Sequence, residues 1–95
     1  MSERINNQGQ VSNGLPIICA EWQKNSRETM RVRLDEYQGE WIIDCRAWYA
    51  DKDGNLRAGR GGLTLSVRHL PQLAKAVDDA LIAAKASGLL EGEQP

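Results

Sequence analysis

The fold is decided by three consecutive stretches, which read TMRVRLDEY (29–37), QG (38–39) and EWIIDCRAWYA (40–50). In the first stretch Met30, Val32 and Leu34 alternate with Arg31 and Arg33, and a similar alternation runs through the third. A period of two is typical of a strand with one buried and one solvated face. Because a short turn containing a glycine separates the two strands, we predict a β-hairpin.

Two further strands are predicted on either side of this hairpin. IICAEWQK (17–24) precedes it, and a polar turn connects the two. After the turn DKDGN (51–55), a short strand at 55–58 is interrupted by GRGG (59–62) and resumes at LTL (63–65). Glycines inside a strand are typical of a bulge or of a close backbone approach to a ligand, and a flexible loop explains them equally well.

The remainder of the chain is predicted to form one helix. Its apolar residues recur at helical spacing in a single stripe, made of Leu70, Leu73, Ala74, Val77, Ala80, Leu81 and Ala84. Ser66 suits an N-cap, whereas Pro71 places the start of the helix nearer Leu70, and Gly88 fits the position just past its end. The order β-β-β-β-α predicts an α+β fold.

The chain of 95 residues has room for one domain, which we place at residues 15–90. Residues 1–14 are expected to form a flexible polar tail, and residues 91–95 a second tail. No apolar run is long enough to span a membrane, and the N-terminus lacks the apolar segment of a secretory signal. We therefore expect a reducing, cytoplasmic location. There Cys19 and Cys45 are expected to be small buried residues rather than a disulfide.

Charge is distributed unevenly along the chain, whose formal net charge is −1. Residues 24–68 hold nine basic and seven acidic side chains, whereas residues 69–95 carry a net charge of −2. Seven of the nine basic side chains are arginines, which pair bidentately with phosphate and stack on bases. The net charge excludes a generally basic nucleic-acid binder, but it is compatible with a local basic surface.

Arginines and aromatic rings share the predicted solvated face of the hairpin. Arg31, Arg33 and Tyr37 lie on one strand, and Arg46 and Trp48 lie on its partner. Cations that follow phosphates, together with rings that stack on unpaired bases, are a general means of binding single-stranded nucleic acid. The same pattern also fits an ordinary sheet in which the aromatic residues form the core and the arginines are solvated.

The segment YQGEWIIDCRAWYADKDGNLRAGRGGLTL (37–65) resembles the signature of the positive-cofactor-four family of transcriptional coactivators. The preceding KNSRETMRVRL (24–34) is similar to the short prokaryotic and phage members, and the resemblance extends over about residues 17–87. It implies a curved four-stranded antiparallel sheet followed by one C-terminal helix, assembled as a homodimer. It also implies binding of single-stranded DNA or of a melted duplex, with little sequence preference, in transcription, replication or repair. The transcription or replication machinery would then be a further partner.

The resemblance also implies a set of DNA contacts. Arg46 stands at a backbone contact, Tyr49 at a stacking position, and Asp44 at a structural position that orients an arginine. Together with the other basic and aromatic residues of the sheet, the candidate DNA-binding residues are Lys24, Arg27, Arg31, Arg33, Tyr37, Arg46, Trp48, Tyr49, Arg57 and Arg60. Strict alternation puts Arg46 and Tyr49 on opposite faces, so a bulge or strong curvature is needed if both contact DNA.

Several positions depart from the family pattern. Asp35, Gln38 and Glu40 stand where a basic residue is common, Ala58 replaces a proline, and Gly61 replaces a lysine. Missing phosphate contacts predict weaker and less salt-dependent binding. These departures keep a second hypothesis open, a protein-interaction module that retains the fold and has lost most of its nucleic-acid affinity.

An enzyme is not expected, and neither is a metal or another cofactor. Asp51 and Asp53 lie in a predicted turn, where aspartate is favoured for local hydrogen bonding. His69 stands alone near the helix start as a capping or surface residue, so no nucleophile, base and orienting group can be assembled with it. One histidine and two distant cysteines do not supply a structural zinc site.

Overall fold

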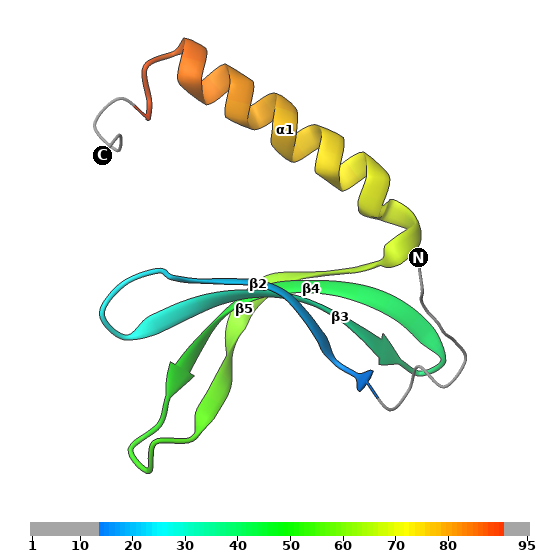
Figure 1. Cartoon of the computed structure of the whole chain (residues 1–95), viewed down its shortest axis with the longest axis vertical. Coiled ribbons are helices and arrows are strands. Elements are labelled where there is room, and N and C mark those ends of the chain that lie inside the picture. Colours follow the sequence, from blue (N-terminus) through cyan, green and yellow to red (C-terminus); the bar gives the residue numbers. More distant parts are fainter. Residues whose placement is uncertain (1–13, 91–95) are drawn as a thin grey trace.

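The computed structural model describes residues 14–90 and shows one open antiparallel sheet followed by a single helix (Figure 1). The elements are β2 (Ile17–Gln23), β3 (Glu28–Tyr37), β4 (Glu40–Ala50), β5 (Leu56–Ser66), the 3-10 helix η2 (Val67–His69) and the helix α1 (Leu70–Ala86). Neighbouring strands pair in chain order, β2-β3-β4-β5. This arrangement confirms the predicted four-stranded sheet with one C-terminal helix. Apart from Gly14, the predicted tails lie outside the described residues.

The central hairpin of β3 and β4 has the predicted form. The two strands pair over their whole length without a break, and this register places Arg31 opposite Arg46. Their turn is made by Gln38 and Gly39, both at positive φ (52° and 82°), as a tight two-residue hairpin turn requires. Because directly paired residues share a face, the alternation along β3 sets the two faces of the sheet.

β5 is one continuous strand, so the expectation that GRGG (59–62) interrupts it is wrong. Instead, the pairing with β4 shifts register at this point, since Arg46 pairs with Gly62 and Trp48 pairs with Ala58. Residues 59–61 therefore lie opposite Ala47 alone. This irregularity is a bulge, which was one of the explanations offered for the glycines.

Close packing at the bulge explains two of its three glycines. A Cβ atom on Gly59 would lie 2.8 Å from the carbonyl oxygen of Ala47, and one on Gly62 would lie 2.6 Å from the Cβ atom of Arg46. A Cβ atom on Gly61 would have no atom within 4 Å. A larger residue at Gly59 would therefore clash with the backbone of β4, and one at Gly62 would displace the Arg46 side chain.

The helix begins and ends close to the predicted positions. α1 starts at Leu70 with Pro71 in its first turn. Ser66 caps the 3-10 helix η2 rather than α1, because its hydroxyl accepts a hydrogen bond from the N–H of Arg68 at 3.4 Å. Gly88 adopts a φ of 74° and ends the helix in a Schellman motif. No helix within residues 14–90 is long and apolar enough to cross a membrane.

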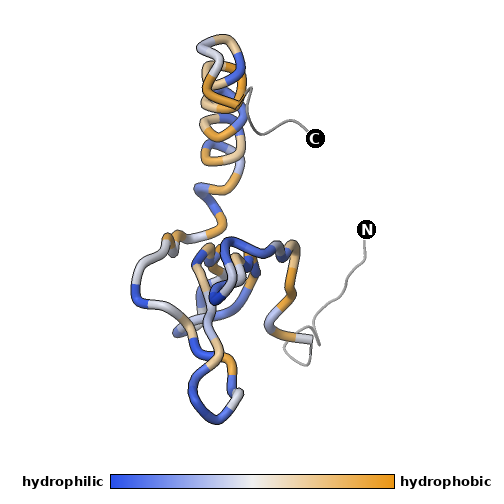
Figure 2. The backbone as a smooth tube through the Cα atoms, turned by 90° about the vertical axis from the view of Figure 1, so that its left-hand side faces the viewer, coloured by the Kyte–Doolittle hydropathy of each residue, from blue (hydrophilic) through white to orange (hydrophobic). Residues whose placement is uncertain are grey.

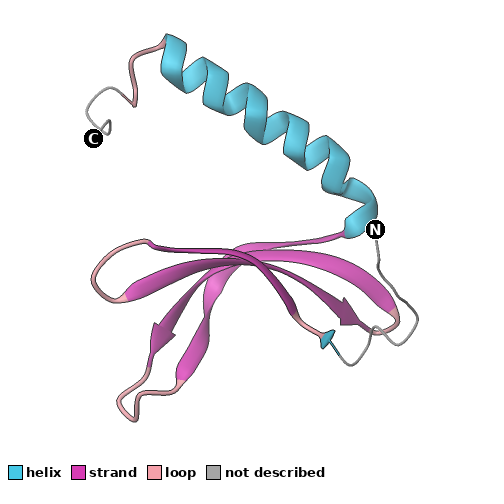
Figure 3. Ribbon diagram, in the orientation of Figure 1, coloured by secondary structure: helices cyan, strands magenta, loops and turns pink. Residues whose placement is uncertain are grey.

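A single chain buries very little hydrophobic core. The helix lies on one side of the sheet and slopes away from it (Figures 1 and 3). Ile43 is the one buried hydrophobic residue among the described residues. Apolar segments recur along the helix in Figure 2, and Val77 and Leu81 are 59% and 43% exposed. On the sheet, Trp22 is 52% exposed.

An apolar groove lies between the helix and the sheet. Its volume is about 490 Å³, and its walls include Trp22, Val32 and Ile43 from the sheet and Leu73, Val77 and Leu81 from α1. The predicted apolar stripe of the helix therefore faces the sheet, but the two surfaces are not packed tightly together.

The two cysteines are free, as predicted, but they are not buried. Cys19 is exposed on the edge strand β2, where the register with β3 shifts between Ile18 and Ala20. Cys45 is partly buried and lines the apolar groove. The expectation of burial was wrong because it assumed a closed core, which one chain alone does not form.

Candidate nucleic-acid interface

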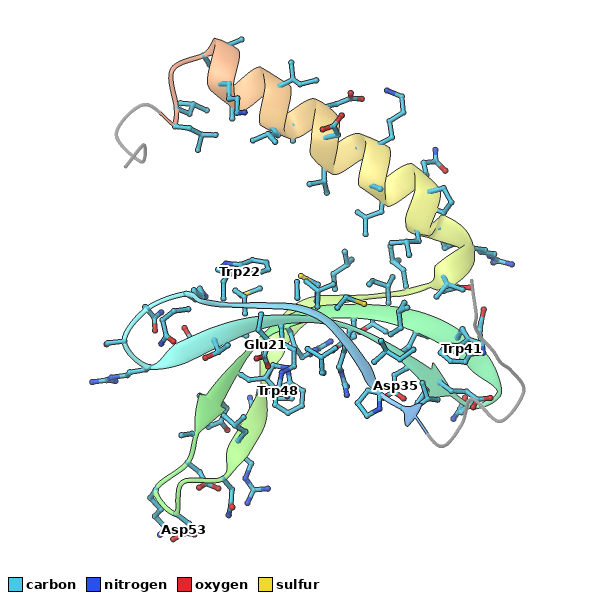
Figure 4. The ribbon with its side chains drawn as sticks, in the orientation of Figure 1. Glu21, Trp22, Asp35, Trp41, Trp48 and Asp53 are labelled. Atoms are coloured by element: carbon cyan, nitrogen blue, oxygen red, sulfur yellow. The ribbon has the colours of Figure 1, made fainter. Side chains whose placement is uncertain are left out.

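The side of the sheet turned away from the helix carries the predicted arginines. Glu21 and Trp48 lie on this side, whereas Trp22 lies on the helix side (Figure 4). The unbroken β3–β4 register and the two-residue alternation bring five of the predicted residues to this side, four of them near its middle and Tyr37 at the end of β3. We call the surface formed by Arg31, Arg33, Arg46 and Trp48 the arginine face.

Trp48 occupies the centre of the arginine face. The Cζ atoms of Arg31 and Arg33 lie 4.7 Å and 5.3 Å from the centroid of its ring, within the range of cation–π attraction. Its indole Nε1 is buried and has no hydrogen-bond partner among the described residues. Trp48 therefore helps to position two guanidinium groups, and its stacking on a base stays a prediction.

Asp44 lies beneath the arginine face and is only 2% exposed. Its carboxylate accepts hydrogen bonds from Nε of Arg46 at 2.9 Å and 3.1 Å, and from Nε of Arg33 at 3.2 Å. It also accepts one from the hydroxyl of Thr64 at 2.7 Å, on the residue directly opposite in β5. One carboxylate thus connects three strands, which confirms the expected role of Asp44 in orienting an arginine.

The charge of Asp44 is stabilised by these contacts. Burial opposes ionisation, but the hydrogen bonds from Arg46, Thr64 and Arg33 outweigh it and hold the pKa of Asp44 below its ordinary value. The carboxylate is therefore ionised at neutral pH. It compensates the positive charge of two guanidinium groups that are themselves largely covered.

Arg46 directs most of its donors into the protein. Its Nη1 donates to the carbonyl oxygens of Gly59 at 3.1 Å and of Arg60 at 3.4 Å, and its Nη2 donates to the Thr64 hydroxyl at 2.8 Å. These bonds hold the bulge of β5 against β4. The side chain is 18% exposed, and its contact with a DNA backbone stays a prediction.

The other predicted cations divide into paired and unpaired groups. The pairs are Arg31 with Glu21, Arg33 with Asp35 at 3.4 Å, Arg57 with Asp51 at 2.8 Å and Lys24 with Glu28 at 3.5 Å. The side chains of Arg27 and Arg60 have no hydrogen bond or ion pair with any residue of the described part of the chain, and both residues are exposed. These two cations are therefore immediately available to an anionic ligand.

Arg27 and Tyr49 meet at the end of the β2–β3 hairpin. Both line a hollow of about 500 Å³, and Tyr49 is 42% exposed. The turn beside it is held by Asn25, whose Oδ1 accepts hydrogen bonds from the N–H groups of Arg27 at 2.9 Å and Glu28 at 2.8 Å. An exposed ring therefore lies beside an unpaired cation on a well-ordered turn.

The structure does not bring Tyr49 onto the arginine face. Tyr49 pairs with Glu28 in a register that has no break. The alternation along β4 therefore places the Tyr49 side chain on the opposite face of the sheet from Arg46. The expected bulge exists, but its extra residues are in β5 and leave β4 regular. Contact of one ligand with both residues therefore depends on the bend of the β4–β5 hairpin, whose tip points away from the helix (Figure 3).

The remaining candidates lie around the rim of the sheet. Tyr37 is 63% exposed beside the β3–β4 turn, and Arg57 lies near the β4–β5 turn. Lys24 and Arg60 come together at the bulge, where both line a hollow of about 360 Å³. The ten predicted residues therefore form a central group and several peripheral ones, and not a single patch.

The turn between β4 and β5 is organised by Asp51. Its Oδ1 accepts hydrogen bonds from the N–H groups of Asp53 and Asn55, each at 2.9 Å, which confirms the expected local role of this aspartate. The hydrogen bond from Arg57, followed by those from the backbone, lowers the pKa of Asp51 from its ordinary value. No three His, Cys, Asp or Glu side chains within the described residues are grouped to hold a metal ion.

Sequence reasoning missed Glu21, Thr64 and Asn25. Glu21 faces Arg31 only because β2 pairs with β3 in one particular register, and this register contains a bulge. Thr64 reaches Asp44 across the β4–β5 pairing. The one available signal was local, because an Asn at the start of a turn that precedes a strand is typical of an Asx turn.

An open antiparallel sheet with one arginine-rich face, followed by a single C-terminal helix, places the chain in the class of small α+β proteins built on one open sheet. Within this class, the chain belongs to the family described as Transcriptional Coactivator p15 (PC4), whose model matches residues 24–76. This finding confirms the resemblance seen in the sequence. Membership points to a nucleic-acid-binding, coactivator-like function.

Solved structures of bacterial and phage proteins have the same fold. A PC4 homologue from Burkholderia pseudomallei K96243 in a tetragonal crystal form is 25% identical, with a TM-score of 0.61 over 68% of this chain and 96% of that one. Its orthorhombic form gives a TM-score of 0.60 over 68% and 88%. A bacteriophage T5 homologue of the eukaryotic coactivator PC4, implicated in recombination-dependent DNA replication, is 18% identical with a TM-score of 0.60. That match covers 82% of this chain and 88% of the phage protein, and it supports the fold alone.

Proposed function

We propose that the protein binds single-stranded DNA as a homodimer, with little sequence preference and without chemical change to the DNA. The observation that carries this proposal is the arginine face, on which guanidinium groups surround an indole ring on the solvent side of an open sheet. Guanidinium groups bind phosphates bidentately. The location that follows from this function is the cytoplasm of a prokaryote, at the nucleoid, or the nucleus of a eukaryote.

Exposed rings around the sheet favour a single strand over a duplex. Tyr37 and Tyr49 are 63% and 42% exposed, so both rings are accessible to unpaired bases. Stacking of this kind contributes about 1–3 kcal/mol per base. A duplex keeps its base faces covered and gains nothing from these rings. Arg27 and Arg60 supply unpaired cations for the phosphates between the stacked bases.

The apolar groove supports the homodimer. An isolated chain would leave Trp22, Val77 and Leu81 largely exposed on both walls of this groove. A second copy brings an identical helix with an identical apolar stripe, and two-fold pairing of the same surface is the commonest way to close such a face. Burial of these side chains by the partner contributes about 1.5–3 kcal/mol for each one fully covered.

A salt-dependent titration tests the proposed function. The protein is titrated against a labelled 20-nucleotide single strand, the matching duplex and the matching RNA, and fluorescence anisotropy is measured between 50 and 300 mM salt. We expect a roughly micromolar Kd for the single strand at low salt, weaker duplex binding, and an affinity that falls as salt rises. Equal affinity for duplex and single strand would contradict the proposal.

The alternative function is that of a protein-interaction module with little nucleic-acid affinity. The observation that favours it is the pairing of five candidate cations with carboxylates of the same chain, namely Lys24, Arg31, Arg33, Arg46 and Arg57. This alternative predicts no binding to any of the three nucleic acids at 50 mM salt. The same titration therefore separates the two functions.

A further inference from the structure

Glu21 and Arg31 form an ion pair at the edge of the arginine face, and nothing in the proposed function requires it. Glu21 lies on the edge strand β2 directly opposite Arg31 on β3, and its Oε2 accepts a hydrogen bond from the Arg31 Nε. Figure 4 shows Glu21 on the same side of the sheet as Trp48, away from the helix. The Glu21 carboxylate is therefore placed where a ligand of the arginine face would arrive.

Two carboxylates serve the arginine face in different ways. The Asp44 side chain is 4% exposed and has contacts with Arg33, Arg46 and Thr64, so the fold depends on it. The Glu21 side chain is 41% exposed, and among the described residues its one polar side-chain partner is Arg31. The Arg31 side chain is 19% exposed, so the pair opens to solvent at its carboxylate end, where ion pairs contribute little to stability. Glu21 can therefore leave Arg31 without loss of the fold.

Arg31 is well prepared for a replacement ligand. Its Cζ atom lies 4.7 Å from the centroid of the Trp48 ring, which helps to fix the guanidinium group whether or not Glu21 is present. A phosphate offers the same geometry of paired anionic oxygens to a guanidinium group as a carboxylate does. The two anions therefore compete for one cation.

We infer that the Glu21 carboxylate occupies the position next to Arg31 that a nucleic-acid phosphate takes in the complex. DNA binding then proceeds by exchange of the carboxylate for the phosphate. This inference rests on the proposed function and identifies Glu21 as a residue that sets its affinity. The free protein keeps Arg31 neutralised, and a strand must displace Glu21 before it gains this contact. The affinity for single-stranded DNA and its dependence on salt are therefore both lower than they would be if every arginine of the face were free.

The test compares two substitutions that each remove one negative charge. Glu21→Gln keeps the shape of the side chain and frees Arg31, whereas Asp79→Asn frees Lys75 on the distant helix, where the pair is exposed. Kd for a labelled 20-nucleotide single strand is measured against salt for both variants and the wild type. For Glu21→Gln we expect binding about 3- to 10-fold tighter at 50 mM salt and a slope of log K against log salt steeper by about 0.7. For Asp79→Asn we expect a change below about twofold.

A second pair of variants shows whether the gain passes through Arg31. Glu21→Gln should improve binding in the wild type but not in an Arg31→Gln background, which is the non-additivity expected of groups in direct contact. Equal gains in both backgrounds, or a Glu21→Gln gain no larger than that of Asp79→Asn, would overturn the inference while leaving the proposed function intact. Absence of binding by both the wild type and Glu21→Gln would overturn both, whereas binding by Glu21→Gln alone would support the inference.

Discussion

The two faces of the sheet differ in how fully the contacts of a single chain cover their side chains. On the arginine face, Asp44 is 2% exposed and its carboxylate accepts hydrogen bonds from side chains on three strands of the same chain. On the helix face, Ile43 is the one buried hydrophobic residue of the described chain, and the groove between helix and sheet stays open. The polar face is therefore built by short hydrogen bonds within the chain, whereas the apolar face is left open by the contacts of a single chain.

Removing the central carboxylate should break the arginine face. Asp44→Ala leaves Arg33 and Arg46 without their shared partner in a covered position, and we expect a loss of about 3 kcal/mol in the free energy of unfolding. Urea denaturation followed by circular dichroism measures this loss. Asp53→Ala, in an exposed turn, is the matched control and should change the stability by less than about 0.5 kcal/mol. Equal stability of the two variants would show that the network contributes nothing.

A charge in the apolar groove should break the other face. Leu81→Glu puts a carboxylate on the groove wall, and we expect the proposed dimer to weaken by about 2 kcal/mol, or roughly thirtyfold. Sedimentation equilibrium measures the dissociation constant. Ala83→Glu introduces the same residue on an exposed position of the same helix and should leave assembly unchanged. A monomeric wild type, or the same effect from both variants, would contradict the proposed dimer through the groove.

The bulge offers a finer test of how tightly the arginine face is packed. Gly62→Ala places a Cβ atom 2.6 Å from Cβ and 2.9 Å from Cζ of Arg46, so Arg46 must move and the expected cost is about 1.5 kcal/mol. Gly61→Ala meets no atom within 4 Å and should be neutral or slightly stabilising. Thermal and urea unfolding of both variants give the comparison. A loss at Gly61 as large as that at Gly62 would refute the packing explanation.

Acid should weaken the arginine face before it affects the groove. Because the pKa of Asp44 is lowered in the folded protein, its contribution is fully present above the unfolded value of about 3.9 and is lost as the pH falls through the folded pKa. The stability difference between wild type and Asp44→Asn should therefore be constant from pH 7 to about 5 and shrink below about 4. Unfolding free energies measured across this range provide the check. A difference that grows in acid would contradict the sign of the shift.

Local patterns predicted most of the fold. The alternation from Met30 to Leu34, the glycine turn and the proline at Pro71 placed the hairpin and the helix start, because each is decided by neighbours in the chain. The continuity of β5 was missed because GRGG (59–62) reads locally as a break, whereas pairing with β4 holds it as a bulge.

The candidate site was predictable only in part. Alternation correctly placed Arg31, Arg46 and Trp48 on one side of the sheet. The ion pairs could not be predicted, since Glu21 reaches Arg31 only through the register between β2 and β3. Cys45 was wrongly expected to be buried, because the apolar groove that it lines is not closed by residues of one chain.

The most direct test of the central claim follows the indole N–H signals of the three tryptophans by NMR while a single-stranded oligonucleotide is added. Trp48 lies on the arginine face and Trp22 on the helix face, so each reports on one side of the sheet (Figure 4). We predict that the Trp48 signal shifts in proportion to bound DNA, while the Trp22 signal stays in place. A shift of Trp22 without one of Trp48 would contradict the account, because DNA would then bind the helix side of the sheet.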